Sequence, residues 1–194
     1  MKTTIVVLAI LFLSTAGYSQ NNKTSRFYFS LDGGLNKYTE NTYYTSGLAM
    51  SLKGGYKLSN NSMAGIKFDY SANHYSDYSK FENYYSKVVS GGQIVDASVK
   101  AFFSYGNFKN SVKFRPYFTI AAGLEFIKGT GILTLNSGAI SGSEFQTYLG
   151  MDFGIGLDYK FSENLSMYVQ PGFKGIINYG NTSTSLKMGV TFNP

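Results

Sequence analysis

After its first twenty-odd residues, the chain consists of eight segments in which apolar and polar residues alternate with a period of two, joined by connections of alternating length. The short connections are 59–62, 106–111 and 162–164, and the long ones run from about 36 to 46, 73 to 92, 127 to 144 and 176 to 183. A closed barrel in an outer membrane has tight turns on the periplasmic side and longer loops outside. The pattern predicts an all-β, eight-stranded antiparallel transmembrane barrel with periplasmic termini, short periplasmic turns and longer extracellular loops.

The two faces of these segments differ in character. In the first segment Phe27, Phe29 and Leu31 share one face, whereas Ser30 and Asp32 share the other. Segments of about ten residues match a strand that crosses the hydrocarbon layer at a tilt. Small and charged residues on the polar face suit a narrow lumen, so we expect the apolar face to meet lipid. The barrel must then be closed, because lipid leaves no partner for an unpaired strand edge.

Ten charged residues fall on the face expected to point inward. They are Lys53, Lys67, Lys100, Lys174 and Lys187, with Asp32, Asp69, Asp96, Glu125 and Asp152. An eight-stranded barrel encloses just enough room for its side chains, and an unpaired buried charge costs several kcal/mol. We therefore expect a paired network with little or no open channel, and a narrow ion-selective pore is the less favoured alternative.

The N-terminal residues have the pattern of a secretory signal peptide. Lys2 supplies a positive charge, residues 5–13 an apolar core too short to span a bilayer, and residues 14–20 a small and polar exit. We expect cleavage after Ser19, a short periplasmic segment over residues 20–25 and the barrel over residues 26–194. A leader that ends in Ser-Gln resembles those of the Bacteroidota.

Composition removes several classes of function. The chain has no cysteine, which excludes disulfides, thiolate metal sites and thiol nucleophiles. Its net charge of +6 is spread over single lysines, without the basic run that tracks nucleic-acid phosphates. We therefore expect no nucleic-acid partner and no cofactor.

His74 is the single histidine and the one weak catalytic candidate. Asp69 and Asp77 are near it in sequence, and a functional interpretation makes His74 a general base oriented by Asp77 beside Ser76 or Ser79. The competing interpretation is a polar loop residue, which we favour because one histidine beside one aspartate is common by chance. A metal site would need further ligands that this region lacks. We expect no enzyme.

The second long connection is the richest in aromatic residues, with Tyr75, Tyr78, Phe81, Tyr84 and Tyr85. Tyrosine is favoured in protein contacts because it is large, amphipathic and has few rotamers to freeze. The same residues could instead form the interfacial aromatic belt of a membrane barrel. Both interpretations stay open at this stage.

Two motifs give the chain a resemblance to a known family. Residues 115–124 (RPYFTIAAGL) resemble a recurrent strand of the small eight-stranded outer-membrane β-barrels of the OmpA/OmpX type, and residues 154–166 (GIGLDYKFSENLS) resemble the hairpin that follows it. Lys187, Gly189, Val190 and Phe192 resemble the C-terminal signal that the barrel-assembly machinery reads, although the chain continues through Asn193 and Pro194. Because the chain stops at the eighth strand, we expect no peptidoglycan-binding domain.

The resemblance indicates a fold more than an activity. We favour a structural or interaction role, in which the barrel displays its loops or serves as an accessory subunit of a larger outer-membrane complex. The alternative is surface binding, adhesion or resistance through the Tyr-rich second loop. Expected partners are membrane lipid, the barrel-assembly machinery during biogenesis and the larger complex.

Overall fold

The computed structural model describes residues 26–39, 45–74, 87–135, 138–177 and 182–193. These residues form eight strands: β1 Phe27–Tyr38, β2 Gly47–Lys57, β3 Ser62–His74, β4 Lys87–Gly106, β5 Phe114–Leu135, β6 Gly138–Lys160, β7 Leu165–Ile177 and β8 Thr182–Phe192. In the described part of the chain, no helix has the length and apolar character needed to cross a membrane.

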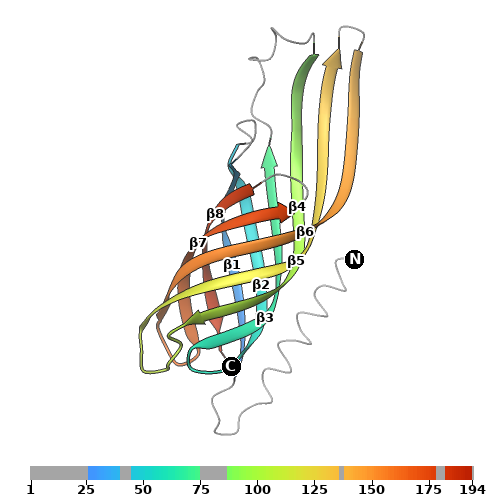
Figure 1. The fold of residues 1–194 in the computed structure, drawn as a ribbon. Coiled ribbons are helices and arrows are strands. Elements are labelled where there is room, and N and C mark those ends of the chain that lie inside the picture. The colour runs from blue at the N-terminus through green and yellow to red at the C-terminus, as the bar shows by residue number, and fades with distance from the viewer. Residues whose placement is uncertain (1–25, 40–44, 75–86, 136–137, 178–181, 194) are drawn as a thin grey trace, which may run out of the picture.

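The strands form one closed antiparallel barrel in sequence order (Figure 1). Each strand pairs with its neighbour along the chain, and β1 closes the barrel against β8 from Phe29↔Phe192 to Tyr38↔Ser183. The predicted fold class is therefore confirmed. Closure gives the first and last strands the backbone partners that an open sheet would leave unsatisfied.

The predicted division of the two faces is also confirmed. Leu31 is 54% exposed, whereas the next residue, Asp32, is 3% exposed. The same alternation continues around the barrel, so that large apolar side chains cover the outer wall and polar side chains fill the lumen. This is the reverse of a soluble protein, whose apolar side chains lie inside.

One end of the barrel, here called the turn end, carries the short connections 58–61, 107–113 and 161–164. Arg26 and Asn193, at the two ends of the described barrel, also lie here, because β1 begins and β8 ends at this side. A backbone hydrogen bond links the first two turns: the N–H of Phe108 donates to the carbonyl of Asn60 at 2.8 Å. The opposite end is called the loop end.

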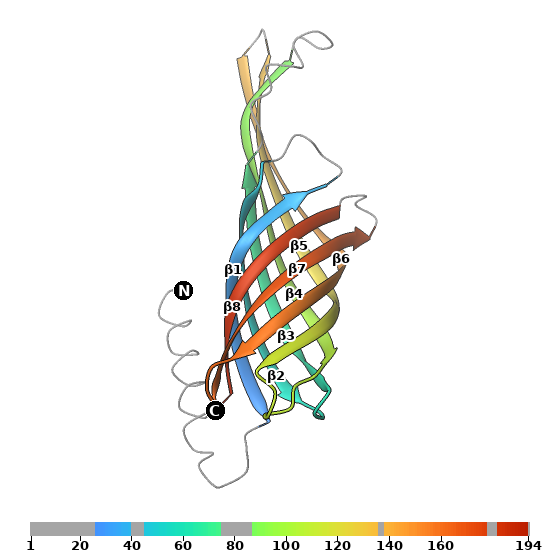
Figure 2. The same ribbon diagram turned by 90° about the vertical axis from the view of Figure 1, so that its left-hand side faces the viewer.

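Three strands continue well past the loop end (Figures 1 and 2). β4, β5 and β6 have 20, 22 and 23 residues, whereas the other five strands have 11 to 13. The strand extension consists of residues 87–92 of β4, 128–135 of β5 and 138–147 of β6. It corrects the prediction that residues 127–144 form a long loop, that the second connection reaches residue 92 and that all strands have about ten residues.

The physical reason for this correction is that strand pairing needs no buried face. The β5–β6 register continues without a break from Lys128↔Phe145 to Leu135↔Gly138, so the backbone groups of both strands are paired outside the barrel. Glycine, serine and threonine are frequent in this segment and obscure the apolar–polar alternation on which the prediction relied.

The strand extension has two free edges among the described residues. β3 pairs with β4 only as far as His74↔Gln93, and β7 pairs with β6 only from Ile177↔Leu149 onward. The β4–β5 register also shifts between Val89 and Gly92, which is an irregularity of the β-bulge kind. The extension is thus a three-stranded sheet attached to the barrel at one end only.

Close contact between β4 and β5 predicts a specific sensitivity to added bulk. A Cβ atom at Gly123 would lie against the carbonyl oxygen of Val99 and 2.7 Å from Cα of Lys100, whereas one at Gly129 of the same strand would meet nothing within 4 Å. We expect Gly123→Ala to lower the free energy of unfolding by about 1–3 kcal/mol and Gly129→Ala to leave it nearly unchanged. Urea unfolding in lipid vesicles, followed by heat-modifiable gel mobility, measures both. Equal stability of the two variants would contradict the packing described here.

Candidate functional site

The middle of the lumen holds a continuous chain of alternating charges. Lys187 pairs with Asp69 at 2.7 Å, and Asp69 pairs with Lys67 at 2.9 Å. Lys67 in turn contacts Asp152, which also accepts from Lys100 at 2.5 Å. These residues come from four strands, so the network ties distant parts of the barrel wall together through its centre.

The chain of charges continues to the other side of the lumen. Lys100 contacts Glu125, and Lys174 lies 3.5 Å from Glu125 and 2.5 Å from Asp96. Lys100 and Glu125 have fully buried side chains. Five cations and five anions are thus balanced once the remaining pair, Lys53 and Asp32 at 3.0 Å, is included.

All ten predicted inward charges are therefore in the lumen and paired, as the sequence predicted. One buried pair was missed: Arg115 donates through Nε to Asp158 at 2.6 Å near the turn end. The sequence contains the pattern that predicts this pair. Arg115 is two residues from the inward Tyr117, and Asp158 is six residues from the inward Asp152, so both fall on the inward face.

Towards the loop end, the lumen changes from charged to apolar. Tyr38, Ile94, Ile127 and Ile176 are buried together, and Tyr148 packs against them. Next to this cluster, the side-chain amide of Asn73 donates to the carbonyl of Asn36 at 2.9 Å, and both residues are buried. The lumen is thus filled at this end by side chains from most of the strands, above the charge network.

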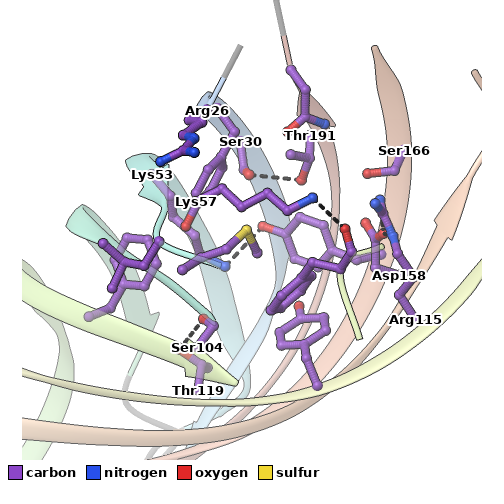
Figure 3. Close-up of a pocket in the computed structure, with 18 of the residues that line it drawn as sticks. Arg26, Ser30, Lys53, Lys57, Ser104, Arg115, Thr119, Asp158, Ser166 and Thr191 are labelled. Atoms are coloured by element: carbon purple, nitrogen blue, oxygen red, sulfur yellow. Dashed lines mark hydrogen bonds and ion pairs between the residues drawn. The ribbon is translucent and has the colours of Figure 1, made fainter. Parts of the chain in front are cut away.

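At the turn end the lumen instead opens into a cavity of about 500 Å³ (Figure 3). Its wall includes three tyrosines, each directly across from a glycine of the neighbouring strand: Tyr28 from Gly55, Tyr117 from Gly156 and Tyr168 from Gly189. A Cβ atom on any of these glycines would come within 2.8 Å of the opposing ring. The glycines therefore allow the rings to lie close against the wall, which leaves the centre of the cavity free.

His74 occupies the last position of β3 and is exposed. It belongs to the outward set of β3, whereas Asp69 is buried in the lumen and bound to Lys67 and Lys187. Asp69 is therefore not its partner. The other residues of the catalytic hypothesis, Asp77, Ser76 and Ser79, lie outside the described residues. Within the described ranges, no three His, Asp or Glu side chains are grouped to hold a metal ion.

The outer wall carries an aromatic girdle near the turn end, formed by Phe27, Tyr56, Tyr105, Phe114, Phe118, Tyr159, Phe161 and Phe192. Its members contact one another, as in the pair Phe27–Tyr56 with ring centroids 5.1 Å apart and the pair Phe114–Tyr159 at 4.8 Å. Aromatic girdles mark the interfaces of membrane barrels. The Tyr-rich segment, for which a belt was one of two open interpretations, lies at residues 75–85, outside the described residues.

The apolar band of the outer wall ends where the strand extension begins. On β4, β5 and β6 its last outward residues are Val95, Phe126 and Leu149, and the next outward residues are Gln93, Lys128 and Thr147. Phe145 is the one large apolar side chain described beyond this level, and its ring stacks on Phe126 at 6.5 Å. Among the extension residues whose side chains are described (92, 128–130 and 142–147), the surface is thus mostly polar, unlike the barrel wall.

The charge network predicts a large cost for removing one buried cation. In Lys100→Met, Glu125 and Asp152 lose a partner inside the lumen, which we expect to lower the free energy of unfolding by about 3–5 kcal/mol. Lys37→Met, at an exposed position of β1, serves as the control and should change stability by less than about 0.5 kcal/mol. Urea titration of the refolded barrel measures both, and a Lys100→Met protein as stable as the control would contradict the network.

The filled lumen also predicts electrical behaviour. We expect planar-bilayer recordings of the purified protein to show no stable conductance on the nanosiemens scale, because charged pairs and the apolar cluster occupy the passage. The double variant Ile94→Ala and Ile127→Ala shortens two side chains of that cluster and tests whether the loop-end layer is a barrier. Steady open-channel currents from the unaltered protein would show that the lumen conducts.

Comparison with solved structures finds similar folds across nearly the whole barrel. The neisserial surface protein A is 18% identical with a TM-score of 0.54, and the alignment covers 88% of this chain and 98% of that one. Ail, the attachment invasion locus protein of Yersinia pestis, solved in complex with the heparin analogue sucrose octasulfate, is 13% identical with a TM-score of 0.57 over 88% and 99% of the two chains. A major outer membrane protein from Thermus thermophilus is 13% identical with a TM-score of 0.53, over 86% and 98%.

A search of the curated proteins found no match to this chain. At these identities the solved structures show the fold alone. Residues 5–192, in contrast, match the family described as outer membrane protein beta-barrel domain, which covers nearly the whole chain. Together with the closed eight-stranded barrel and its apolar outer wall, this match shows that the chain belongs to the outer membrane β-barrel protein family and that its place is the outer membrane.

Proposed function

We propose that the protein is a non-enzymatic outer-membrane anchor that presents the strand extension as an interaction surface on the outside of the cell. The observation that carries this proposal is the extension itself, a three-stranded sheet that continues beyond the apolar band and whose two outer strands have no further strand partner among the described residues. The sequence suggests a barrel that displays loops, and in this proposal the displayed element is the extension. The display element is a sheet attached to the barrel wall.

The shape of the barrel supports an outward direction of the extension. The turn end carries short connections and the described chain ends, which in outer-membrane barrels lie on the periplasmic side. A signal peptide over residues 1–19 agrees with this orientation, since an exported chain reaches the outer membrane from the periplasm. The extension then lies on the opposite, extracellular side.

Free strand edges are suited to binding an extended segment of another protein. Their unpaired N–H and C=O groups form main-chain hydrogen bonds with an added strand, and neighbouring side chains set the specificity. Glu144, Phe145 and Thr147 are exposed at the β6 edge. Phe145 is 64% exposed and gives this edge an apolar contact point beside polar neighbours.

Two expected alternatives remain candidates on specific observations. The Tyr-rich segment over residues 75–85 precedes β4 in the sequence, and tyrosine is favoured in protein contacts. Surface binding through this segment is one alternative. An accessory-subunit role would instead use the apolar wall, where Leu124 and Phe153 are about half exposed.

Photo-crosslinking in intact cells separates these roles. p-Benzoylphenylalanine is placed at Phe145 on the extension, at Leu124 on the barrel wall, and at Asn164 in a turn at the turn end. We expect a protein crosslink from Phe145 and none from Leu124. A variant in which Asn-Gly replaces residues 130–143 keeps the register pair Gly129↔Glu144 and closes with a favoured hairpin turn. It should lose the crosslink and keep heat-modifiable mobility.

The positions that give crosslinks decide between the display and subunit roles. A crosslink to another outer-membrane protein from Leu124, with none from Phe145, would reject display by the extension and support a subunit role. Persistence of the Phe145 crosslink in the shortened variant would show that the removed sheet is not the binding element. A crosslink from Asn164 to a surface partner would contradict the orientation.

A further inference from the structure

We infer that the turn-end cavity is a binding site for a small amphipathic anion, a carboxylate with an aromatic or aliphatic body. The site is separate from the strand extension and lies at the opposite end of the barrel. Its volume of about 500 Å³ is within the range of small-molecule sites. The inference rests on the wall, the floor and the mouth of the cavity.

The wall presents ring surface to the cavity. Tyr168 donates its hydroxyl to Asp32, and Tyr117 donates its hydroxyl to Gln170 at 3.0 Å. Because the two hydroxyls are used in the wall, the rings contribute apolar surface at this level of the lumen. Phe108 continues this surface from the turn 107–113, with its ring 6.0 Å from that of Tyr117.

A second aromatic group also lines the cavity. Tyr28 and Phe102 are buried with ring centroids 6.3 Å apart, and Ala121 and Met63 pack with them. Elsewhere in the middle of the lumen, charged pairs occupy the inward positions. The lining of the cavity is thus mixed: polar and charged side chains form most of it, and the two aromatic groups give it a patch of ring surface. We infer that the apolar body of a ligand would lie against this ring surface.

The charged side chains at the floor of the cavity are paired with one another. Lys67 and Asp152 line its inner end and are paired with each other, and Lys53 is paired with Asp32. No charge at the floor is therefore left for a ligand to neutralise. The charged group of a ligand is expected at the other end, where the cavity meets solvent.

Positive groups outnumber negative ones at the mouth. Lys57, Arg26 and Arg115 line it, and the carboxylates beside them are those of Asp158 and Glu163. Lys57 donates to the backbone carbonyl of Phe108 at 2.6 Å and has no carboxylate partner among the described residues (Figure 3). Arg115 and Lys160 lie near enough to repel its ammonium group. Of these four cations, Arg115 is paired, with Asp158. An anionic group beside Lys57 would relieve this repulsion.

The wall and the mouth together define the ligand. Its ring or chain would lie between the two aromatic groups, and its carboxylate would accept hydrogen bonds from Lys57 at the opening. A neutral molecule of the same shape would lose the charged contact, and a cation would add to the repulsion. A large polyanion would not pass between the turns into a cavity of this size.

Photoaffinity labelling with 4-benzoylbenzoate tests the inference directly. The full-length mature protein is labelled in nanodiscs of neutral lipid, and the modified residues are identified by peptide mass spectrometry. We expect labels on residues that line the cavity, such as Met63 and Tyr28. Labelling by the neutral analogue 4-(hydroxymethyl)benzophenone should be weaker by on the order of tenfold, since it lacks the hydrogen bond to a charged partner.

Three variants make the test specific. Lys57→Met should weaken carboxylate labelling on the order of tenfold, and Thr119→Phe should abolish it by filling the cavity. Lys113→Met removes the same charge at an exposed position of the turn end that does not line the cavity, and it should label like the unaltered protein. Heat-modifiable mobility checks that each variant is folded.

The opposite results would overturn the inference. Labels confined to the outer wall, or equal labelling by the carboxylate and the neutral analogue, would show partition into lipid instead of a site. Unchanged cavity labelling in folded Lys57→Met would reject the role of the cationic mouth. No labelling at millimolar probe would show a cavity that holds only water.

Discussion

The pairing of β1 with β8 is the constraint on which the rest of the structure depends. In lipid, a free edge would leave backbone N–H and C=O groups without partners, so the eight strands must close. Closure with eight strands leaves a lumen only wide enough for side chains. The inward face then cannot be rich in solvated charge, and each buried lysine or carboxylate needs a partner across the lumen. The network centred on Lys100 and Asp152 meets this demand.

The lumen has three layers, and each suggests a different role. Apolar side chains around Ile94 fill the loop end, charged pairs fill the middle, and an aromatic cavity opens at the turn end. A filled lumen gives no reason to assign transport to this barrel. The interactions that we propose use the parts that leave the barrel wall or open from it, namely the strand extension and the turn-end cavity.

Much of the fold was predictable because membrane barrels obey a strict alternation. The sequence alone places Leu31 outside and Asp32 inside, and the same rule located all ten charges of the network. It failed at the loop end, where Ile127 and Ile176 are inward but apolar, so that the alternation of character stops while the strand continues. It failed again over residues 128–144, where backbone pairing alone maintains the strands.

The cavity could not be predicted from the sequence because it depends on register. That Tyr28 lies across from Gly55 requires knowledge of how β1 pairs with β2, and no motif in either strand records it. For His74 the alternation is sufficient: it puts His74 and Asp69 on opposite faces of one strand, and the structure confirms this separation. The signal cleavage after Ser19 and an origin in the Bacteroidota stay predictions.

The orientation of the barrel is the central claim, and cysteine labelling tests it most directly because the chain contains no native cysteine. Ser143→Cys on the extension and Asn164→Cys at the turn end are both exposed positions. In intact cells, a membrane-impermeant maleimide should label the cysteine at position 143 and should reach that at position 164 only after the outer membrane is permeabilised. Labelling of position 164 but not of position 143 in intact cells would contradict the account.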